Sequence, residues 1–178
     1  MNLAVWLRES ARTAPEAPAL LSGTAVVADY AAFACRAAAF GRHLAEERGI
    51  APGDRVGLFM TNRTRFLEIL FGVWWAGAAA VPINAKLHPR EAAWILADAG
   101  ARLAVFSANV GGGLAALADE LPDGIALCDV EGEAVESALA GAPMEGPVHR
   151  AGDDLAWLFY TSGTTGRPKG DMLNHLNL

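Results

Sequence analysis

The sequence predicts an α/β fold, in which a mostly parallel sheet carries helices on both faces. Three observations support this class. From about residue 54 onward, strand-like runs alternate with segments of helical periodicity, which is the order of successive β-α-β units. Several of these runs are apolar throughout, as are strands of a parallel sheet that is covered on both faces. The length of 178 residues fits one domain with a sizeable core, since domains commonly hold roughly 100–200 residues.

The N-terminal part of the chain predicts two helices and a hairpin. Residues 3–13 have the pattern of a short amphipathic helix, and "PALLSGTAVVAD" holds two apolar runs around Ser22-Gly23, as small hairpins do. A longer helix follows Asp29, which can cap it, and Gly49 lies beyond its end. The apolar face of this helix consists of Tyr30, Phe33, Ala37, Phe40 and Leu44.

The alternating part predicts five strands and the helices between them. The predicted strands are 54–60, 79–84, 102–107, 124–130 and 155–162. Four helices are predicted between and after these strands. The first carries Phe66, Ile69, Leu70, Val73 and Trp74 on one face. The next two are 89–100 and 114–121, and the last starts within "DMLNHLNL" at 171–178. Asn62 can cap the first of these helices, and Pro82 ends a strand. The stretch 141–154 predicts a long surface connection, because it contains two prolines and three glycines.

Charge and cysteine usage narrow the function classes. The formal net charge of −6 and the lack of any basic run argue against nucleic-acid binding, which requires clustered Lys and Arg. Cys35 and Cys128 lie in apolar segments without metal-type spacing, so we expect buried free thiols in a reducing compartment. The four histidines form no ligand cluster, and we expect His175 to be solvated or to cap a helix.

The sequence further predicts a soluble, cytoplasmic protein without a membrane span. Arg8 and Glu9 precede any long apolar run, so the N-terminus does not resemble a signal peptide. The uncharged stretch 69–85 is shorter than the roughly 20 residues of a spanning helix, and Gly77 and Pro82 divide it. We interpret it as a buried helix followed by a buried strand.

The segment "YTSGTTGRPKG" at 160–170 has the composition of a phosphate-binding loop. Three glycines let backbone N–H groups approach an anion, four hydroxyls add donors and a lysine adds positive charge. These residues are Gly163, Gly166 and Gly170, then Thr161, Ser162, Thr164 and Thr165, and Lys169. A strand before the loop and a helix after it suit a polyphosphate, because a helix N-terminus favours negative charge.

Two alternatives to this interpretation concern the loop itself. The spacing is not that of the common nucleotide P-loop, which would require Gly at Pro168 and Ser or Thr at Gly170. A flexible Gly/Ser/Thr linker has a similar composition. The apolar strand directly before the loop disfavours the linker interpretation.

The stretch "LAWLFYTSGTTGRPKG" (155–170) closely resembles the signature LAYxxYTSG(S/T)TGxPKG of the adenylate-forming enzymes, which include acyl-coenzyme A synthetases, luciferases and peptide-synthetase adenylation domains. Only Trp157 departs from that pattern. "WWAGAAAVPIN" (74–84) resembles a second motif of the family, AGxxxVPxN/D, and "VADYAAF" is a faint version of an early segment. The resemblance spans nearly the whole chain, 1–178, and implies the first part of the large N-terminal, ATP-binding domain.

The resemblance implies a two-step reaction. A carboxylate, such as a fatty or other acyl acid, attacks the α-phosphate of Mg-ATP to give an acyl-adenylate and pyrophosphate, and coenzyme A then takes the acyl group. By this resemblance the loop residues bind the β- and γ-phosphates, Lys169 is the catalytic residue, and a hydroxyl of Thr161 or Thr164 lies near Mg²⁺. The bound set would be Thr161, Ser162, Gly163, Thr164, Thr165, Gly166, Lys169 and Gly170.

Two departures from the family pattern bear on activity. Asp171 stands where the family usually has a small apolar residue, and a carboxylate there would repel a triphosphate unless it turns to solvent or caps the following helix. The chain ends at Leu178, whereas the resemblance implies several hundred further residues with the adenine pocket, most of the acyl pocket and a second catalytic lysine. We therefore expect the chain alone to hold part of the phosphate site and not to run the reaction.

Two other function classes remain as alternatives. The chain could be a truncated, non-catalytic nucleotide-binding module, or one that forms homo-oligomers through Trp and Leu surfaces that absent subdomains would cover. "GGGLAA" (111–116), with Asp129 beyond it, superficially fits the dinucleotide-binding fingerprint of an oxidoreductase. However, several residues separate the predicted strand end at Ser107 from Gly111, whereas the fingerprint glycine turns directly off its strand.

Overall fold

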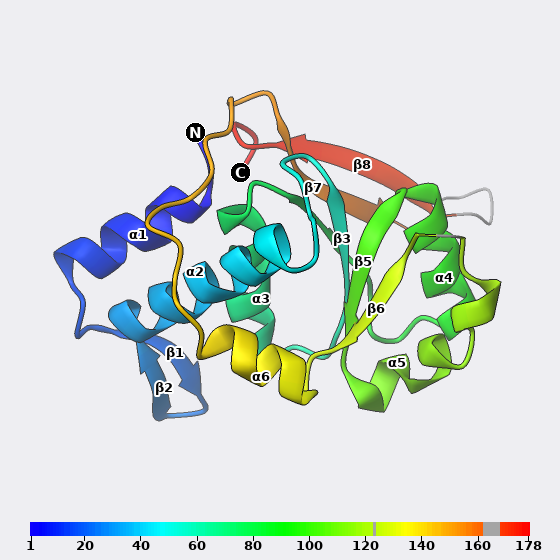
Figure 1. Ribbon diagram of the computed structural model, residues 1–178, viewed down its shortest axis with the longest axis horizontal. Coiled ribbons are helices and arrows are strands. Elements are labelled where there is room, and N and C mark those ends of the chain that lie inside the picture. Colours follow the sequence, from blue (N-terminus) through cyan, green and yellow to red (C-terminus); the bar gives the residue numbers. More distant parts are fainter. Residues whose placement is uncertain (123, 162–167) are drawn as a thin grey trace.

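The computed structural model describes residues 1–122, 124–161 and 168–178, and it confirms the α/β class (Figure 1). The strands are β1 (Pro18–Ser22), β2 (Ala25–Asp29), β3 (Arg55–Phe59), β4 (Ala79–Pro82), β5 (Ala101–Phe106), β6 (Ala126–Asp129), β7 (Leu155–Thr161) and β8 (Lys169–Asn174). The helices are α1 (Ala4–Thr13), α2 (Tyr30–Glu46), α3 (Thr64–Trp75), α4 (Pro89–Asp98), α5 (Ala108–Ala115), α6 (Glu133–Leu139) and a 3₁₀ turn at Ala118–Glu120.

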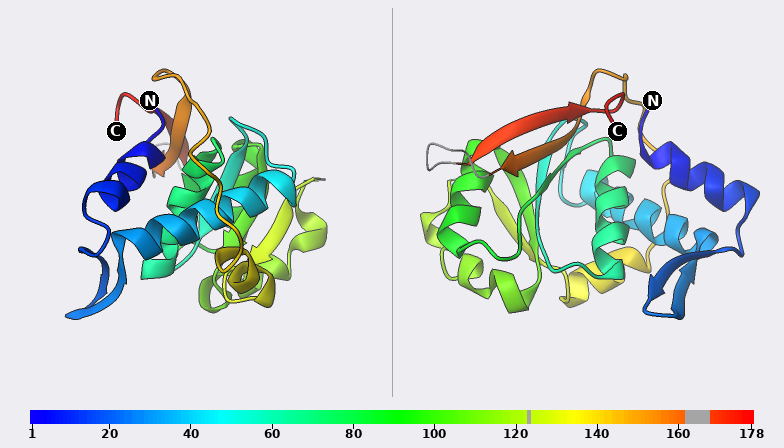
Figure 2. Two further views of the ribbon diagram at one scale, coloured as in Figure 1. Left: turned by 60° about the vertical axis from the view of Figure 1, so that its left-hand side comes forward. Right: turned by 180° about the vertical axis from the view of Figure 1, so that it is seen from behind.

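The main sheet has six strands in the order β6-β5-β3-β4-β7-β8. The pairs from β6 to β7 are parallel, and β8 joins β7 antiparallel. The predicted hairpin around Ser22-Gly23 is confirmed as the β1–β2 pair, which stands apart from the main sheet beside α2 (Figures 1 and 2). Alternating strands and helices thus build a mostly parallel sheet, as predicted.

Side chains of the central strands alternate between two apolar cores, because successive residues of a strand point to opposite faces. Val56 and Leu58 of β3 belong to the core beneath α1, α2, α3 and α6, whereas Phe59 belongs to the core beneath α4. All three side chains are fully buried. Gly57 also faces α4, and a Cβ atom there would overlap the Leu96 side chain, so the helix packs directly on the strand backbone.

Both ends of helix α4 are held by side-chain hydrogen bonds. At its start, His88 and Glu91 form a capping box, in which the His88 N–H donates to Glu91 Oε2 at 2.9 Å. At its end, the Arg55 guanidinium of β3 donates to the carbonyl oxygens of Ala99 and Gly100, both at 2.8 Å. Arg55 thereby satisfies carbonyl groups that a helix end leaves without partners.

The predicted helix in "DMLNHLNL" is wrong. Lys169–Asn174 forms strand β8, and Asn174 opens a turn in which its side chain accepts from the N–H groups of Leu176 and Asn177. The edge of β7 that faces away from β4 would otherwise leave its backbone groups without partners. Pairing with β7 therefore outweighs the weak local helix preference of this segment.

The other differences concern helix positions. Residues 114–121 were predicted as a helix, but α5 begins earlier, at Ala108, and includes the glycines of "GGGLAA". These glycines lie inside the helix rather than in a turn off the strand, and Cβ atoms at Gly111 and Gly113 would overlap Phe106 and Pro89. Gly111 and Gly113 therefore serve close packing inside a helix, and the dinucleotide-binding geometry is not formed. Helix α6 was not predicted.

Three predictions for single residues are also wrong. Asn62 does not cap α3, because Arg63 is the N-cap residue. Cys128 is buried as expected, but Cys35 is exposed because it lies on the outer face of α2. His175 is only 5% exposed, and its Nδ1 accepts a hydrogen bond from the Leu3 N–H at 3.3 Å.

The two ends of the chain lie side by side (Figure 1). Besides the Leu3–His175 bond, the Asn2 side-chain amide donates to the carbonyl oxygens of Trp74 and Val148, at 2.6 and 2.8 Å. Val148 belongs to the predicted connection 141–154, which has no helix or strand. None of the helices in the described parts of the chain is long and apolar enough to cross a membrane.

Candidate functional site

The β7–β8 hairpin frames the predicted phosphate loop. Thr161 is the last residue of β7 and Lys169 is the first of β8, and the two stand directly opposite each other in the antiparallel register. Both residues are exposed. The other predicted loop residues, Ser162, Gly163, Thr164, Thr165 and Gly166, lie outside the described residues. The structure therefore places the two residues at the base of the loop and brings them together.

Strand alternation gives the hairpin two different faces. Thr161 and Lys169 share the outer face with Phe159 and Asp171, which are also paired with each other. All four residues are exposed. Of the two alternatives for Asp171, the residue is exposed to solvent and does not cap a helix, because it lies within strand β8.

The inner face of the hairpin packs on α4. Tyr160 and Gly170 are opposite each other on this face, and the Tyr160 hydroxyl donates to Asp98 Oδ2 of α4 at 2.6 Å. The Trp94 ring of α4 meets the Tyr160 ring edge to face, with centroids 6.2 Å apart. Burial, followed by the neighbouring Asp98 carboxylate, raises the pKa of the Tyr160 hydroxyl, which therefore remains a hydrogen-bond donor at neutral pH.

The start of β7 is anchored on the opposite side of the sheet. The Trp74 indole N–H of α3 donates to the Ala156 carbonyl oxygen at 2.9 Å, and its ring packs against Trp157. Trp74 is only 6% exposed, so this hydrogen bond is protected from water. Both ends of β7 are therefore fixed to helices, which positions Thr161.

The donor set at the hairpin fits polyphosphate oxygens. An ammonium and a hydroxyl on one open face can both donate to anionic oxygen atoms. Among the described residues there is no cluster of His, Cys, Asp and Glu that could hold a metal ion. Mg²⁺ does not need such a cluster, because it commonly keeps several waters and binds through substrate phosphates with one or two protein oxygens. The Thr161 hydroxyl can supply one such oxygen.

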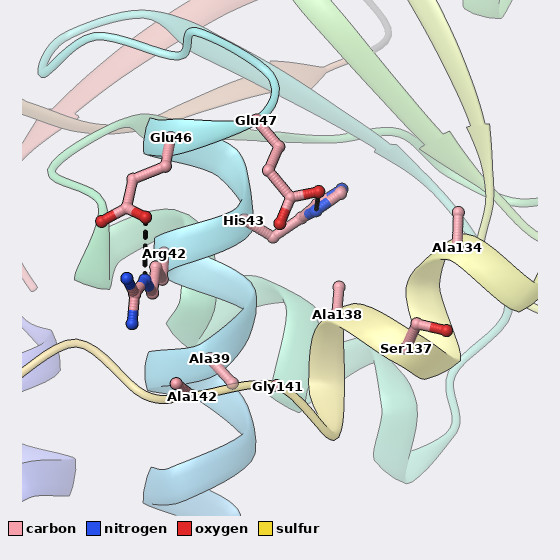
Figure 3. Close-up of a pocket in the computed structure, with 10 residues that line it drawn as sticks. All are labelled: Ala39, Arg42, His43, Glu46, Glu47, Ala134, Ser137, Ala138, Gly141 and Ala142. Carbon is pink, nitrogen blue, oxygen red and sulfur yellow. Dashed lines mark hydrogen bonds and ion pairs between the residues drawn. The ribbon is translucent and has the colours of Figure 1, made fainter.

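A separate cavity lies between α2 and α6 (Figure 3). It has a volume of about 470 Å³ and walls of small residues such as Ala39, Ala138 and Gly141. At its rim, Arg42 pairs with Glu46 at 2.8 Å (Figure 3). None of the predicted site residues lines this cavity.

Comparison with known proteins identifies related chains. Residues 7–178 match the model of the family described as AMP-binding enzyme. The chain is 39% identical to the long-chain-fatty-acid–CoA ligase FadD13 of Mycobacterium tuberculosis over 71% of its own length and 26% of the ligase. It is 38% identical to a feruloyl-CoA synthase of Amycolatopsis over 99% of its length and 34% of that protein.

Solved structures similar to this chain also include an acyl-CoA synthetase. A fatty acyl CoA synthetase of Mycobacterium tuberculosis superimposes with a TM-score of 0.85 and 30% identity, over 98% of this chain and 34% of that chain. The chain thus spans between a quarter and about a third of the length of these relatives. Its fold matches the beginning of the N-terminal domain of adenylate-forming enzymes.

Proposed function

Because this chain belongs to the AMP-binding enzyme family, we propose that it supplies the triphosphate-binding part of an ATP-dependent acid–thiol ligase. In the first step, a carboxylate oxygen of an acyl acid forms a bond to the α-phosphorus of ATP, and the bond from that phosphorus to the β-phosphate oxygen breaks. The products are an acyl-adenylate and pyrophosphate. In the second step, the thiol sulfur of coenzyme A attacks the acyl carbon, and AMP leaves.

The observation that carries this proposal is the Thr161–Lys169 pair at the base of the segment "TSGTTGRPK". Negative charge grows on the pyrophosphate as it leaves, and a positioned ammonium and hydroxyl stabilise that charge. The names of the relatives, which include ligases of long-chain fatty acids and of ferulic acid, support a carboxylic acid as substrate and coenzyme A as the thiol.

The experiment uses the two lysines of the chain as a matched pair. Lys169 is at the hairpin, and Lys86 is exposed in the connection between β4 and α4. Titration calorimetry would measure the affinity of the chain for Mg-ATP and for pyrophosphate. We expect Lys169→Ala to weaken both about 10- to 100-fold, since a hydrogen bond to a charged group contributes about 1.5–3 kcal/mol, and Lys86→Ala to leave both unchanged.

Carboxylate-dependent exchange of pyrophosphate into ATP tests the full reaction. A chain that binds Mg-ATP without catalysing exchange would act as the non-catalytic nucleotide-binding module. Equal affinities in the Lys169→Ala and Lys86→Ala variants, or no binding by the unaltered chain, would contradict the proposed role of the hairpin. Homo-oligomer formation stays a prediction, which sedimentation of the chain would check.

A further inference from the structure

The end of β7 contacts helix α4 and is not paired with β4. The two strands share one bridging residue pair, Ala80 with Trp157, and β4 ends at Pro82, so the last residues of β7 have no partner on β4. The β7–β8 hairpin forms the border of the sheet, and its far end reaches α4 (Figure 1). The position of the hairpin end therefore depends on its contacts with α4 and not on a continuous ladder with β4.

Tyr160 contacts both α4 and β8. Its hydroxyl donates to Asp98, its ring meets the edge of Trp94, and its ring also lies against the backbone of β8. A Cβ atom at Gly170 would stand 3.1 Å from Tyr160 Cζ, which is tighter than ordinary van der Waals contact. The ring is thus held between the helix and the glycine directly opposite it.

Asp98 occupies an unfavourable position for helix stability. It is the last residue of α4, where the helix dipole is negative, and the last turn of this helix contains no basic residue. The nearby Arg55 donates to the carbonyl oxygens of Gly53, Ala99 and Gly100. Among the described residues, the Tyr160 hydroxyl is the hydrogen-bond partner of the Asp98 side chain. The Asp98 carboxylate therefore accepts the Tyr160 hydrogen bond at a position where it does not stabilise the helix.

We propose that Asp98 and Tyr160 are a positioning pair that sets the direction in which Thr161 and Lys169 face. Tyr160 is on the inner face of β7 and Thr161 is the next residue, so fixing one side chain to α4 turns the other to the open face. The pair lies on the face of the hairpin opposite Thr161 and Lys169, so it would act on a bound phosphate only through these two residues. This inference rests on the proposed function, because the consequence it predicts is an effect on phosphate affinity.

The experiment compares variants that remove one end of the hydrogen bond. Tyr160→Phe keeps the ring, Asp98→Ala removes the acceptor, and Asp98→Asn keeps an acceptor oxygen. Tyr30→Phe, at the only other tyrosine of the sequence, is the matched control. Two quantities are measured, the affinity for pyrophosphate by titration calorimetry and the hydrogen-exchange rates of the backbone amides of Thr161, Lys169 and Gly170.

We expect Tyr160→Phe and Asp98→Ala each to weaken pyrophosphate binding three- to tenfold and to speed exchange at these three amides by a similar factor. Exchange in β3 should stay unchanged, since a merely structural loss would affect the whole sheet. The double variant should be no weaker than either single one, because both changes break one interaction. Asp98→Asn should restore most of the affinity, and Tyr30→Phe should match the unaltered chain.

Unchanged exchange rates at the hairpin amides would contradict the proposal that Asp98 and Tyr160 act as a positioning pair. Additive effects in the double variant would contradict it too. If the unaltered chain does not bind pyrophosphate, the proposed function fails. The positioning role of Asp98 and Tyr160 is then tested by hydrogen exchange alone. In that case, faster exchange confined to the hairpin supports the pair and uniform exchange rejects it. If Tyr160→Phe does not fold, the comparison of Asp98→Ala with Asp98→Asn decides.

Discussion

Strands β3 and β7 belong to the same sheet but are built under different constraints. β3 has a parallel partner along its length on each side, and its residues from Val56 to Phe59 are all buried. β7 shares one residue pair with β4, and its exposed outer face carries Phe159 and Thr161. The centre of the sheet is therefore specified by side-chain volume, whereas the outer face of β7, next to the border strand β8, leaves Phe159 and Thr161 open to solvent.

A matched pair of phenylalanines gives the largest expected effect. Phe59 of β3 is fully buried, whereas Phe159 of β7 is 45% exposed. We expect Phe59→Ala to lower the free energy of unfolding by about 3–5 kcal/mol, because it leaves a cavity, and Phe159→Ala to lower it by less than about 1 kcal/mol. Urea unfolding of the two variants measures both values. Similar losses at the two positions would mean that the outer face of β7 is packed like the centre of the sheet.

The pH dependence of stability tests the end of β8, where His175 is buried. Burial, then the positive charges of Arg150 and the N-terminus, lowers the pKa of His175. The unfolded chain binds a proton near pH 6.5, whereas the folded chain binds it only at lower pH. The free energy of unfolding should therefore fall as the pH drops below about 6.5 toward the lowered pKa.

The variant His175→Gln should lose this part of the pH dependence, and His149→Gln, at an exposed histidine, should keep it. Urea midpoints between pH 5 and pH 8 would measure the difference. A pH dependence that is the same in both variants would show that His175 does not link the C-terminal segment to α1 in the way its bond to Leu3 indicates.

The smallest expected effect concerns charge on the outer face of the hairpin. Asp171 is two residues beyond Lys169 on the same face, which in a strand is a separation of about 7 Å. A phosphate bound by Lys169 would lie at a similar distance from Asp171, and two like unit charges about 7 Å apart in water repel by about 0.6 kcal/mol, so Asp171→Asn should tighten pyrophosphate binding about two- to threefold. The unfolding midpoint should not change. A weaker affinity in Asp171→Asn would show that the carboxylate helps to organise the site instead of repelling the ligand.

The sequence predicts the centre of this molecule better than its edge, for physical reasons. The buried strands and α2 have strong periodic patterns, and the cap at Asp29 is local, so their positions follow from short stretches. The strand β8 does not, because it forms by pairing with β7 and its own residues favour no single conformation. Helix α6 had a usable signal, since Val135, Ala138 and Leu139 share a buried face at helical spacing.

Some residues of the candidate site can be predicted from the sequence and others cannot. The signature segment is continuous in sequence, so Thr161 and Lys169 could be named from it directly. Asp98 could not be, because it is 62 residues from Tyr160 and only the fold brings the two side chains together. Similarly, no local pattern shows that the Trp74 indole binds the Ala156 carbonyl.

The late arrival of β7 has a consequence for synthesis on the ribosome. β4 pairs with β7, but residues 83–154 separate them in the chain. At a translation rate of roughly 5–20 residues per second, the β4 edge waits roughly 4–15 s for its partner to be made. During that interval the apolar strand Ala79–Pro82 is the open border of the nascent sheet, and it is the segment on which a chaperone would have the most time to act.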